Sequence, residues 1–258
     1  MNLNDDTPSC DLLVISPHTD DAEIGLGGTI RLLADRGRTV WAVDLTRGEL
    51  GTNATADERW EEAGRASAVL GLAGRAQLDL PDGFIDPTDK EQVGRVAELI
   101  RRLRPRWVAT APDPVRHPDH KQTPKLAERA VFLSRLQAWQ PNGAAVRLWE
   151  GGQPLPEPVP RWQVETLLGV CPDHTTPDLV FDVTAGWAAK EEALACYASQ
   201  FARQEGRQAT MINAPDFLEK IERRGRTWGR LAGVTYGEAL RTTSFPVFDD
   251  LPDTRWSS

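Results

Sequence analysis

Two short acidic motifs contain three of the four histidines of this 258-residue chain. The first reads Ser-Pro-His-Thr-Asp-Asp over 16–21, and the second reads His-Pro-Asp-His over 117–120. Imidazole and carboxylate groups together make a ligand set for a borderline divalent metal, with zinc the first choice and another divalent ion an alternative. Catalytic zinc keeps three protein ligands and one open position. We therefore predict one metal per chain, with three ligands and two further groups for acid–base chemistry. The ligands are His18, Asp21 and His120, and the acid–base groups are Asp20 and His117.

The first half of the chain has the elements that such a site needs. Short apolar runs predict buried strands, and apolar residues at helical spacing predict helices. The two alternate four times, with strands at 11–16, 40–45, 76–80 and 106–111 and helices at 21–36, 58–70, 90–103 and 118–136. This alternation predicts an α/β, Rossmann-like, mostly parallel sheet with helices on both faces. Because both motifs directly follow a strand, the metal site is expected at the carboxyl ends of the strands.

The second half is less regular. A stretch rich in Pro and Gly over 140–161 predicts a surface excursion with a partial strand at 145–148, and further strands are predicted at 163–170 and 179–183. The last helices are predicted at 190–201 and 216–231. No internal repeat or linker divides the sequence. We expect a single domain over 1–258, with irregular tails at 1–10 and about 245–258.

Composition excludes several classes of protein. A hydrophobic content of 40% and a charged content of 26% are typical of an ordered protein. The net charge of −8 argues against nucleic-acid binding but leaves an anionic small substrate open. The N-terminus has no signal pattern and no apolar run reaches the roughly 20 residues that span a bilayer, so we expect a cytoplasmic protein without membrane contact. Three distant cysteines exclude a disulfide framework.

Structural explanations of the motifs are also open. Carboxylates at 20 and 21 are favourable in a first helical turn because of the helix dipole. Pro118 suits the first helical position, which would make His117 a helix cap and leave His120 to pack. The second motif places two histidines around Pro-Asp directly after a predicted strand, as the first motif places His18. Two such histidines are less often structural than a lone histidine, so they favour the metal site.

Three glycines, Gly25, Gly27 and Gly28, allow a distant alternative, a nucleotide-dependent enzyme. In a dinucleotide-binding fingerprint, however, the glycines lie in the turn between strand and helix. Here they come a turn later, inside the predicted helix. Close packing of that helix against the sheet is the better explanation.

The two motifs resemble the hallmarks of the PIG-L/LmbE-like family of zinc-dependent N-acetylglucosamine deacetylases. The similarity extends through 22–25, 44–52 and 59–63, and the segments 80–83 and 197–201 look most like the bacillithiol-biosynthesis branch. That branch removes acetate from N-acetylglucosaminyl malate. The resemblance implies this reaction, with deacetylation of another N-acetyl amino sugar (a mycothiol precursor, chitobiose or an antibiotic intermediate) as the alternative.

The resemblance also implies a role for each residue of the site. His18, Asp21 and His120 would bind zinc. Asp20 would be the general base toward the metal water, and the imidazolium of His117 would stabilise the oxyanion. Asp119 would support the ligands from behind. Four further residues would contact the amino-sugar substrate: Arg59, Arg116, Asn53 and Glu49.

The chain departs from the family pattern at two places. Thr19 stands where relatives often have proline, a change that we expect to be tolerated. Phe217 occupies the place of a late tyrosine that donates to the oxyanion in some relatives, so either His117 and the metal suffice or Tyr236 substitutes. His174 has no assigned role. Similar proteins are often trimers or hexamers, which leaves a homo-oligomer open.

Overall fold

The computed structural model describes residues 7–110, 117–143, 145–171, 175–202 and 208–245. Its centre is a mixed eight-stranded sheet with the order β5-β3-β2-β1-β4-β6-β8-β7. Five adjacent strands run parallel: β3 (Gly74–Leu80), β2 (Val40–Thr46), β1 (Cys10–Ser16), β4 (Pro105–Thr110) and β6 (Thr166–Val170). Three strands flank these five and form antiparallel pairs: β5 (Arg147–Leu148) on one side, and β8 (Gly237–Thr242) and β7 (Leu179–Asp182) on the other. The predicted α/β fold with a mostly parallel sheet is confirmed.

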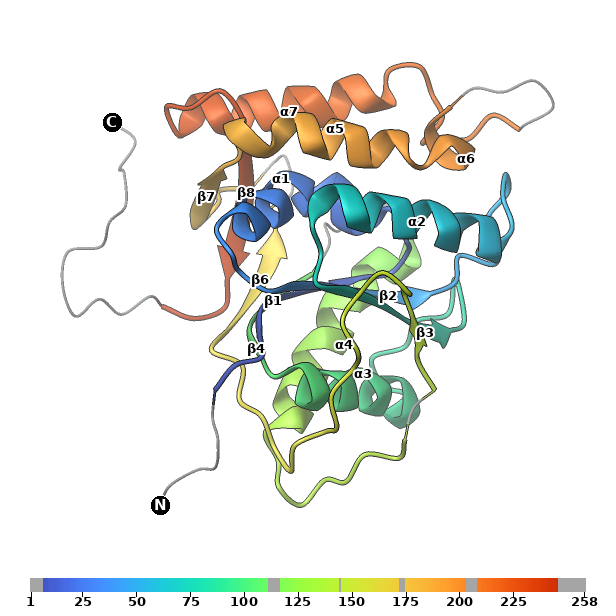
Figure 1. Cartoon of the computed structure of the whole chain (residues 1–258), viewed down its shortest axis with the longest axis vertical. Helices are drawn as coiled ribbons and strands as arrows, with labels where there is room; N and C mark the ends of the chain where they lie inside the picture. Colours follow the sequence, from blue (N-terminus) through green and yellow to red (C-terminus); the bar gives the residue numbers. More distant parts are fainter. Residues whose placement is uncertain (1–6, 111–116, 144, 172–174, 203–207, 246–258) are drawn as a thin grey trace.

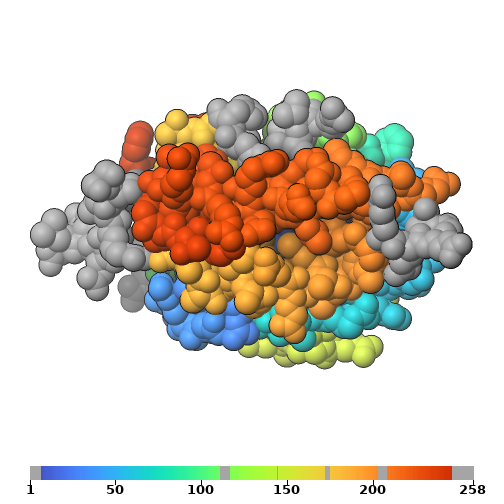
Figure 2. Space-filling view, turned by 90° about the horizontal axis from the view of Figure 1, so that it is seen from above, coloured from blue at the N-terminus to red at the C-terminus, as the bar shows by residue number. Residues whose placement is uncertain are grey.

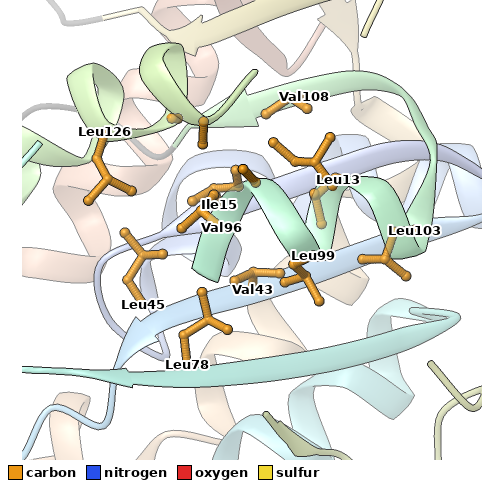
Figure 3. Packing of buried hydrophobic residues seen from close by; sticks show 14 of the residues in the cluster. Leu13, Ile15, Val43, Leu45, Leu78, Val96, Leu99, Leu103, Val108 and Leu126 are labelled. Carbon is orange, nitrogen blue, oxygen red and sulfur yellow. The ribbon is translucent and has the colours of Figure 1, made fainter. Parts of the chain in front are cut away.

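The sheet is buried on both faces, as the apolar strand sequences require. Successive side chains of a strand point to opposite faces. In β1, Leu13 and Ile15 pack into one core cluster with residues of α3 (Lys90–Leu103) and α4 (Pro118–Ser134), as Figure 3 shows. Leu12 and Val14 point the other way, into a cluster with residues of α1 (Asp21–Asp35) and α2 (Ala56–Leu70).

A further helical layer covers α1 and α2 (Figure 1). It contains α5 (Trp187–Ala195), α6 (Ala198–Phe201) and α7 (Phe217–Leu231), with a short 3-10 helix, η1 (Thr184–Gly186), before α5. Figure 2, seen from above, shows α7 lying across this outer face beside α5. No helix in the described ranges is both long enough and apolar enough to cross a bilayer.

Local sequence signals set the helix boundaries. Thr55 caps α2 through a capping box, in which its hydroxyl accepts from the Glu58 N–H at 3.2 Å while Glu58 Oε2 accepts from the Thr55 N–H at 2.7 Å. Gly71 ends the same helix with a φ of 72°, a left-handed conformation that glycine adopts at little cost. Asp89 caps α3, whose observed bounds equal the predicted ones.

The strand order brings the two motifs together. From β1 the chain moves to β2 and β3 on one side, and then returns to place β4 on the other side of β1. This reversal is a topological switch point, where the loops after two adjacent strands diverge and leave a crevice. Those loops carry the first motif, after β1, and the second motif, after β4.

Several predicted elements were wrong in detail. The helix predicted at 190–201 is two helices, because the chain turns at Cys196 and Tyr197, and the Tyr197 hydroxyl donates to the Thr19 carbonyl. The strand predicted at 163–170 is shorter, and Cys10, predicted as tail, opens β1. Strand β8 was missed altogether.

The glycines inside α1 serve close packing, as predicted, but their partners are not mainly in the sheet. A Cβ at position 27 would lie 2.9 Å from Cγ of Lys190 in α5. A Cβ on Gly28 would lie 2.7 Å from Cβ of Val183, just after β7. The Gly28 N–H also donates to Oε1 of Glu238 at 3.0 Å. These contacts explain Gly27 and Gly28 without a nucleotide.

Candidate metal centre

The three predicted ligands converge at the carboxyl end of the sheet. Asp21 Oδ2 lies 3.2 Å from His18 Nδ1 and 3.2 Å from His120 Nε2. All three side chains are buried, and their ligand atoms lie within 4.8 Å of one another. Tetrahedral zinc with bonds of about 2.0–2.1 Å separates two ligand atoms by about 3.3 Å. The arrangement therefore fits one shared divalent cation.

Electrostatics keeps Asp21 ionised and concentrates negative charge around His18. Burial raises the pKa of Asp21, but His120 and His18 outweigh that effect and hold the pKa well below its ordinary value. Burial lowers the pKa of His18, but hydrogen bonds with Asp119, Asp21 and Asp82 raise it further than burial lowers it. A cluster of carboxylates therefore attracts positive charge to this point.

The other nitrogen of His18 faces two more carboxylates. His18 Nε2 lies 3.1 Å from Asp82 Oδ1 and 3.5 Å from Asp119 Oδ2. Asp119 is fixed in turn, since it accepts from the backbone N–H groups of Gly83 at 2.7 Å and Ile85 at 3.2 Å. Carboxylates behind a ligating histidine orient the ring and select its tautomer.

A second group of potential ligands shares His18 with the first. It contains His18, Asp82, His117 and Asp119, whose ligand atoms also lie within 4.8 Å of one another. The two groups use opposite nitrogens of the His18 ring. In the described part of the chain, the geometry therefore offers a cation two adjacent positions.

Asp20 lies beside the three ligands in a buried setting. Its Oδ1 is 3.5 Å from Arg59 Nη2, and Arg59 Nη1 donates to the Gly48 carbonyl at 3.3 Å. Burial raises the pKa of Asp20, and the Arg59 guanidinium opposes that rise. A carboxyl group whose pKa is raised is a stronger proton acceptor than an ordinary carboxylate, which suits a general base.

His117 is the N-cap of α4, as the sequence suggested. Its Nδ1 accepts from the Asp119 N–H at 3.3 Å, and Pro118 follows at the first helical position. Its ring centroid lies 4.7 Å from that of His18 and 5.4 Å from that of His120. Burial and these two neighbouring imidazoles lower the pKa of His117.

One cavity of about 740 Å³ joins these groups. Its lining includes the side chains of the two motifs and of the β3 loop: His18, Asp20, Asp21, Asp82, His117 and His120. Residues of α7 and apolar side chains such as Leu50, Met211 and Phe217 also line it. The volume suits a ligand larger than a single sugar ring.

The predicted substrate-binding residues lie in different settings. Arg59 lines the cavity, but it pairs with Asp20. Glu49 Oε1 accepts from the Asp82 N–H at 2.8 Å, so it holds the backbone of the β3 loop. Asn53 is paired with the backbone of Gln208 through both ends of its amide, each at 2.9 Å. Arg116 and His174 lie outside the described residues.

Neither of the chain's two tyrosines, both of which the structure describes, lines the cavity. Tyr197 is buried beneath Thr19, whereas the Tyr236 ring stacks on Trp187 at 4.2 Å and its hydroxyl donates to Glu222 at 3.1 Å. Phe217 does line the cavity. Of the two residues that the sequence offered for the oxyanion, His117 lines the cavity and Tyr236 does not.

Behind the site, a buried arginine fixes the backbone of the first motif. Arg75 donates to the Thr19 carbonyl, and its guanidinium also contacts Asp44 at 2.7 and 2.8 Å and Glu23 at 2.6 Å. The side chains of Arg75, Asp44 and Glu23 are 0% exposed. This ion cluster positions the turn between His18 and Asp20.

Sequence reasoning missed two parts of the site. Asp82 was only quoted in a family segment, although a carboxylate directly after a strand that neighbours β2 was a usable signal. The cations of α7 that line the cavity were also missed, because the sequence interpretation predicted only a helix at 216–231; the spacing of Arg223 and Arg224 three and four residues after Lys220 was the signal.

Comparison with known proteins identifies the family. Residues 13–131 match the family model described as PIG-L: GlcNAc-PI de-N-acetylase. Diacetylchitobiose deacetylase of Thermococcus kodakarensis is 36% identical over 136 residues, which is 48% of this chain and 50% of that protein. The 1D-myo-inositol 2-acetamido-2-deoxy-alpha-D-glucopyranoside deacetylase of Mycobacterium leprae is 30% identical over 251 residues, which is 73% of this chain and 80% of that protein.

Two further relatives have different names. A probable N-acetyl-alpha-D-glucosaminyl L-malate deacetylase 2 of Bacillus cereus is 30% identical over 132 residues, 46% of this chain and 60% of that protein. A 4-oxalmesaconate hydratase of Pseudomonas putida is 30% identical over 215 residues, 77% of this chain and 76% of that protein. The family therefore holds more than one activity.

The fold agrees with these matches over almost the whole length. The crystal structure of the conserved protein TT1542 from Thermus thermophilus has a TM-score of 0.78 and 34% identity, and the match covers 95% of this chain and 99% of that one. With the two motifs meeting at one crevice, the chain belongs to the PIG-L deacetylase family.

Proposed function

We propose that this chain is a metal-dependent hydrolase that removes acetate from an N-acetylglucosaminyl substrate, with zinc as its metal. One observation carries the proposal: Asp21 Oδ2 lies 3.2 Å from both His18 Nδ1 and His120 Nε2, in a cavity that Asp20 and His117 also line. Three ligands next to two proton-handling groups are what amide hydrolysis needs.

A divalent metal bound by His18, Asp21 and His120 supplies Lewis-acid polarisation of water and of the acetyl carbonyl. Asp20 takes a proton from the attacking water, and it returns that proton to the departing amine. The products are acetate and a free glucosamine amine. Arg59 holds the Asp20 carboxylate beside the ligands while this happens.

His117 stabilises the tetrahedral oxyanion, but as a neutral group rather than as the imidazolium that the resemblance suggested. Because its Nδ1 accepts from the Asp119 N–H, the proton of the neutral ring is on Nε2, and the lowered pKa favours that neutral ring. The Nε2–H is then a fixed donor toward the cavity. One such donor contributes roughly 3 to 4 kcal/mol to transition-state stabilisation.

N-acetylglucosaminyl malate is the substrate that we propose. The segments 80–83 and 197–201 resemble the branch that uses it, one relative carries its name, and the cavity holds cations that suit its carboxylates. The mycothiol precursor, chitobiose and an antibiotic intermediate are the alternatives.

Acetate release from a panel of these four substrates tests the proposal. We expect turnover that a chelator abolishes and that zinc restores, with the highest kcat/KM on the malate conjugate. Metal-independent turnover, or no acetate from any N-acetyl sugar, would contradict it.

A second candidate is the addition of water to an unsaturated carboxylic acid. It is favoured by the hydratase relative, which aligns with 77% of this chain, and by the cavity cations. Both activities require polarised water and a base. Incubation with 4-oxalmesaconate separates them, since hydration removes the absorbance of its conjugated double bond without releasing acetate.

A further inference from the structure

Helix α7 contributes three cations to the lining of the cavity that contains the metal ligands. Lys220, Arg223 and Arg224 of α7 all line the cavity. Arg223 and Arg224 follow Lys220 by three and four residues, so both lie near it on the helix surface. The same cavity is lined by the carboxylates Asp20 and Asp82, which belong to other elements.

Lys220 and Arg223 are not held in a buried structural ion pair. Within the described ranges, the side chain of Arg223 forms no hydrogen bond or ion pair, and the residue is exposed. Lys220 forms one ion pair, with Asp216 at 2.8 Å, in which both side chains are at least half exposed. Arg224 is also engaged with another group. A structural ion pair would bury or satisfy such groups, whereas a ligand-binding helix leaves donors available.

The charge pattern is unusual for this chain. The net charge is −8, yet three cations and no carboxylate of α7 line the cavity. Acidic residues of the helix lie elsewhere: Glu222 pairs with Arg226 at 2.8 Å, and neither lines the cavity. A local positive field over a cleft attracts and orients an anionic ligand.

We propose that Lys220 and Arg223 form a subsite that selects substrates bearing an anionic group on the part of the molecule distant from the acetamide. The acetyl group lies at the metal ligands, and the carboxylate or phosphate reaches α7. This inference rests on the proposed deacetylase function. It assigns recognition of the anion to Lys220 and Arg223 of α7 rather than to Arg59.

The test compares three substrates by acetate release: N-acetylglucosaminyl malate, N-acetylglucosamine 1-phosphate and neutral methyl N-acetylglucosaminide. The variant is Lys220→Gln with Arg223→Gln. The matched control is Arg226→Gln, a cation of the same helix outside the cavity.

We expect the double variant to raise KM for an anionic substrate by about fivefold to tenfold, because exposed charge-assisted contacts are individually modest. The kcat should change little, and KM for the neutral sugar should stay within about twofold of wild type. Added salt should raise KM for the anionic substrate in the wild type more than in the double variant. Whether malate or phosphate shows the larger change identifies the anion.

Two results would overturn the subsite: an equal change in KM for charged and neutral sugars, or the same change in the Arg226→Gln control. If the wild type releases acetate from none of the three substrates, the deacetylase proposal fails. Calorimetric titration with malate then tests the subsite by itself. Malate binding that weakens in the double variant would support it. Absence of malate binding by the wild type would refute the subsite.

Discussion

Arg75→Met should be among the most destabilising single substitutions in the site region. The guanidinium makes two short contacts with Asp44 and one with Glu23, at 2.6 to 2.8 Å, and all three side chains are 0% exposed. Methionine fills similar space but carries no charge. The substitution therefore leaves two carboxylates buried without a counter-charge.

Removing one partner of a buried ion pair costs about 3 to 5 kcal/mol, because the remaining charge stays desolvated. With a urea slope of about 3 kcal/mol/M, the unfolding midpoint should fall by about 1 to 1.7 M. Arg106→Met is the matched control, since Arg106 pairs with Glu165 at 2.8 Å with both side chains about half exposed. That pair should contribute no more than about 1 kcal/mol.

The pH dependence gives a second check on the cause. Burial raises the pKa of Asp44 and of Glu23, and Arg75 opposes both effects. Without Arg75 both values rise further, so the folded state binds protons more tightly than the unfolded state. Stability then increases as pH falls.

The loss of unfolding free energy caused by Arg75→Met should therefore be smaller at about pH 5 than at about pH 8. A midpoint equal to that of the Arg106→Met control would refute the reasoning, as would a deficit that grows on acidification.

Three further predictions concern individual residues. Gly28→Ala should destabilise the fold by about 1 to 3 kcal/mol in urea unfolding, because the added Cβ meets Val183 at 2.7 Å; a neutral effect on stability together with lost NAD binding would revive the nucleotide alternative. Asp20→Asn should lower kcat by about 10²- to 10⁴-fold with full metal content, and metal loss would instead make Asp20 a ligand. Asp119→Asn should weaken metal affinity by about 10- to 100-fold in competition with a chelator. The reason is that the amide cannot accept from Gly83, Ile85 and His18 as a carboxylate does. Unchanged affinity would show that Asp119 does not orient the ligands.

The core of the fold was readable from sequence because its signals are local. The apolar spacing of α3 predicted its bounds, and four apolar runs predicted four of the five parallel strands. Strand β8 was not readable, since its pairing with β6 and β7 depends on residues more than fifty positions away. The break at Tyr197 was hidden for the same reason, because its hydroxyl partner is Thr19.

The site, like the fold, was predictable only where its signals are local in the sequence. Motif spacing and the switch-point rule predicted that His18, Asp21 and His120 meet. The pairing of Arg59 with Asp20 could not be predicted, because it depends on how α2 packs across the first motif. The cations of α7 were equally hidden, since only the tertiary fold shows which face of that helix lines the cavity.

Anomalous diffraction at the zinc absorption edge, on crystals of the zinc-loaded protein, shows directly which side chains bind the cation. We expect one peak bonded to His18 Nδ1, an Asp21 oxygen and His120 Nε2, and loss of that peak in His120→Ala. A peak held by Asp82, His117 and Asp119 instead would contradict it, because the cation would then occupy the adjacent group and leave Asp20 with the wrong neighbour.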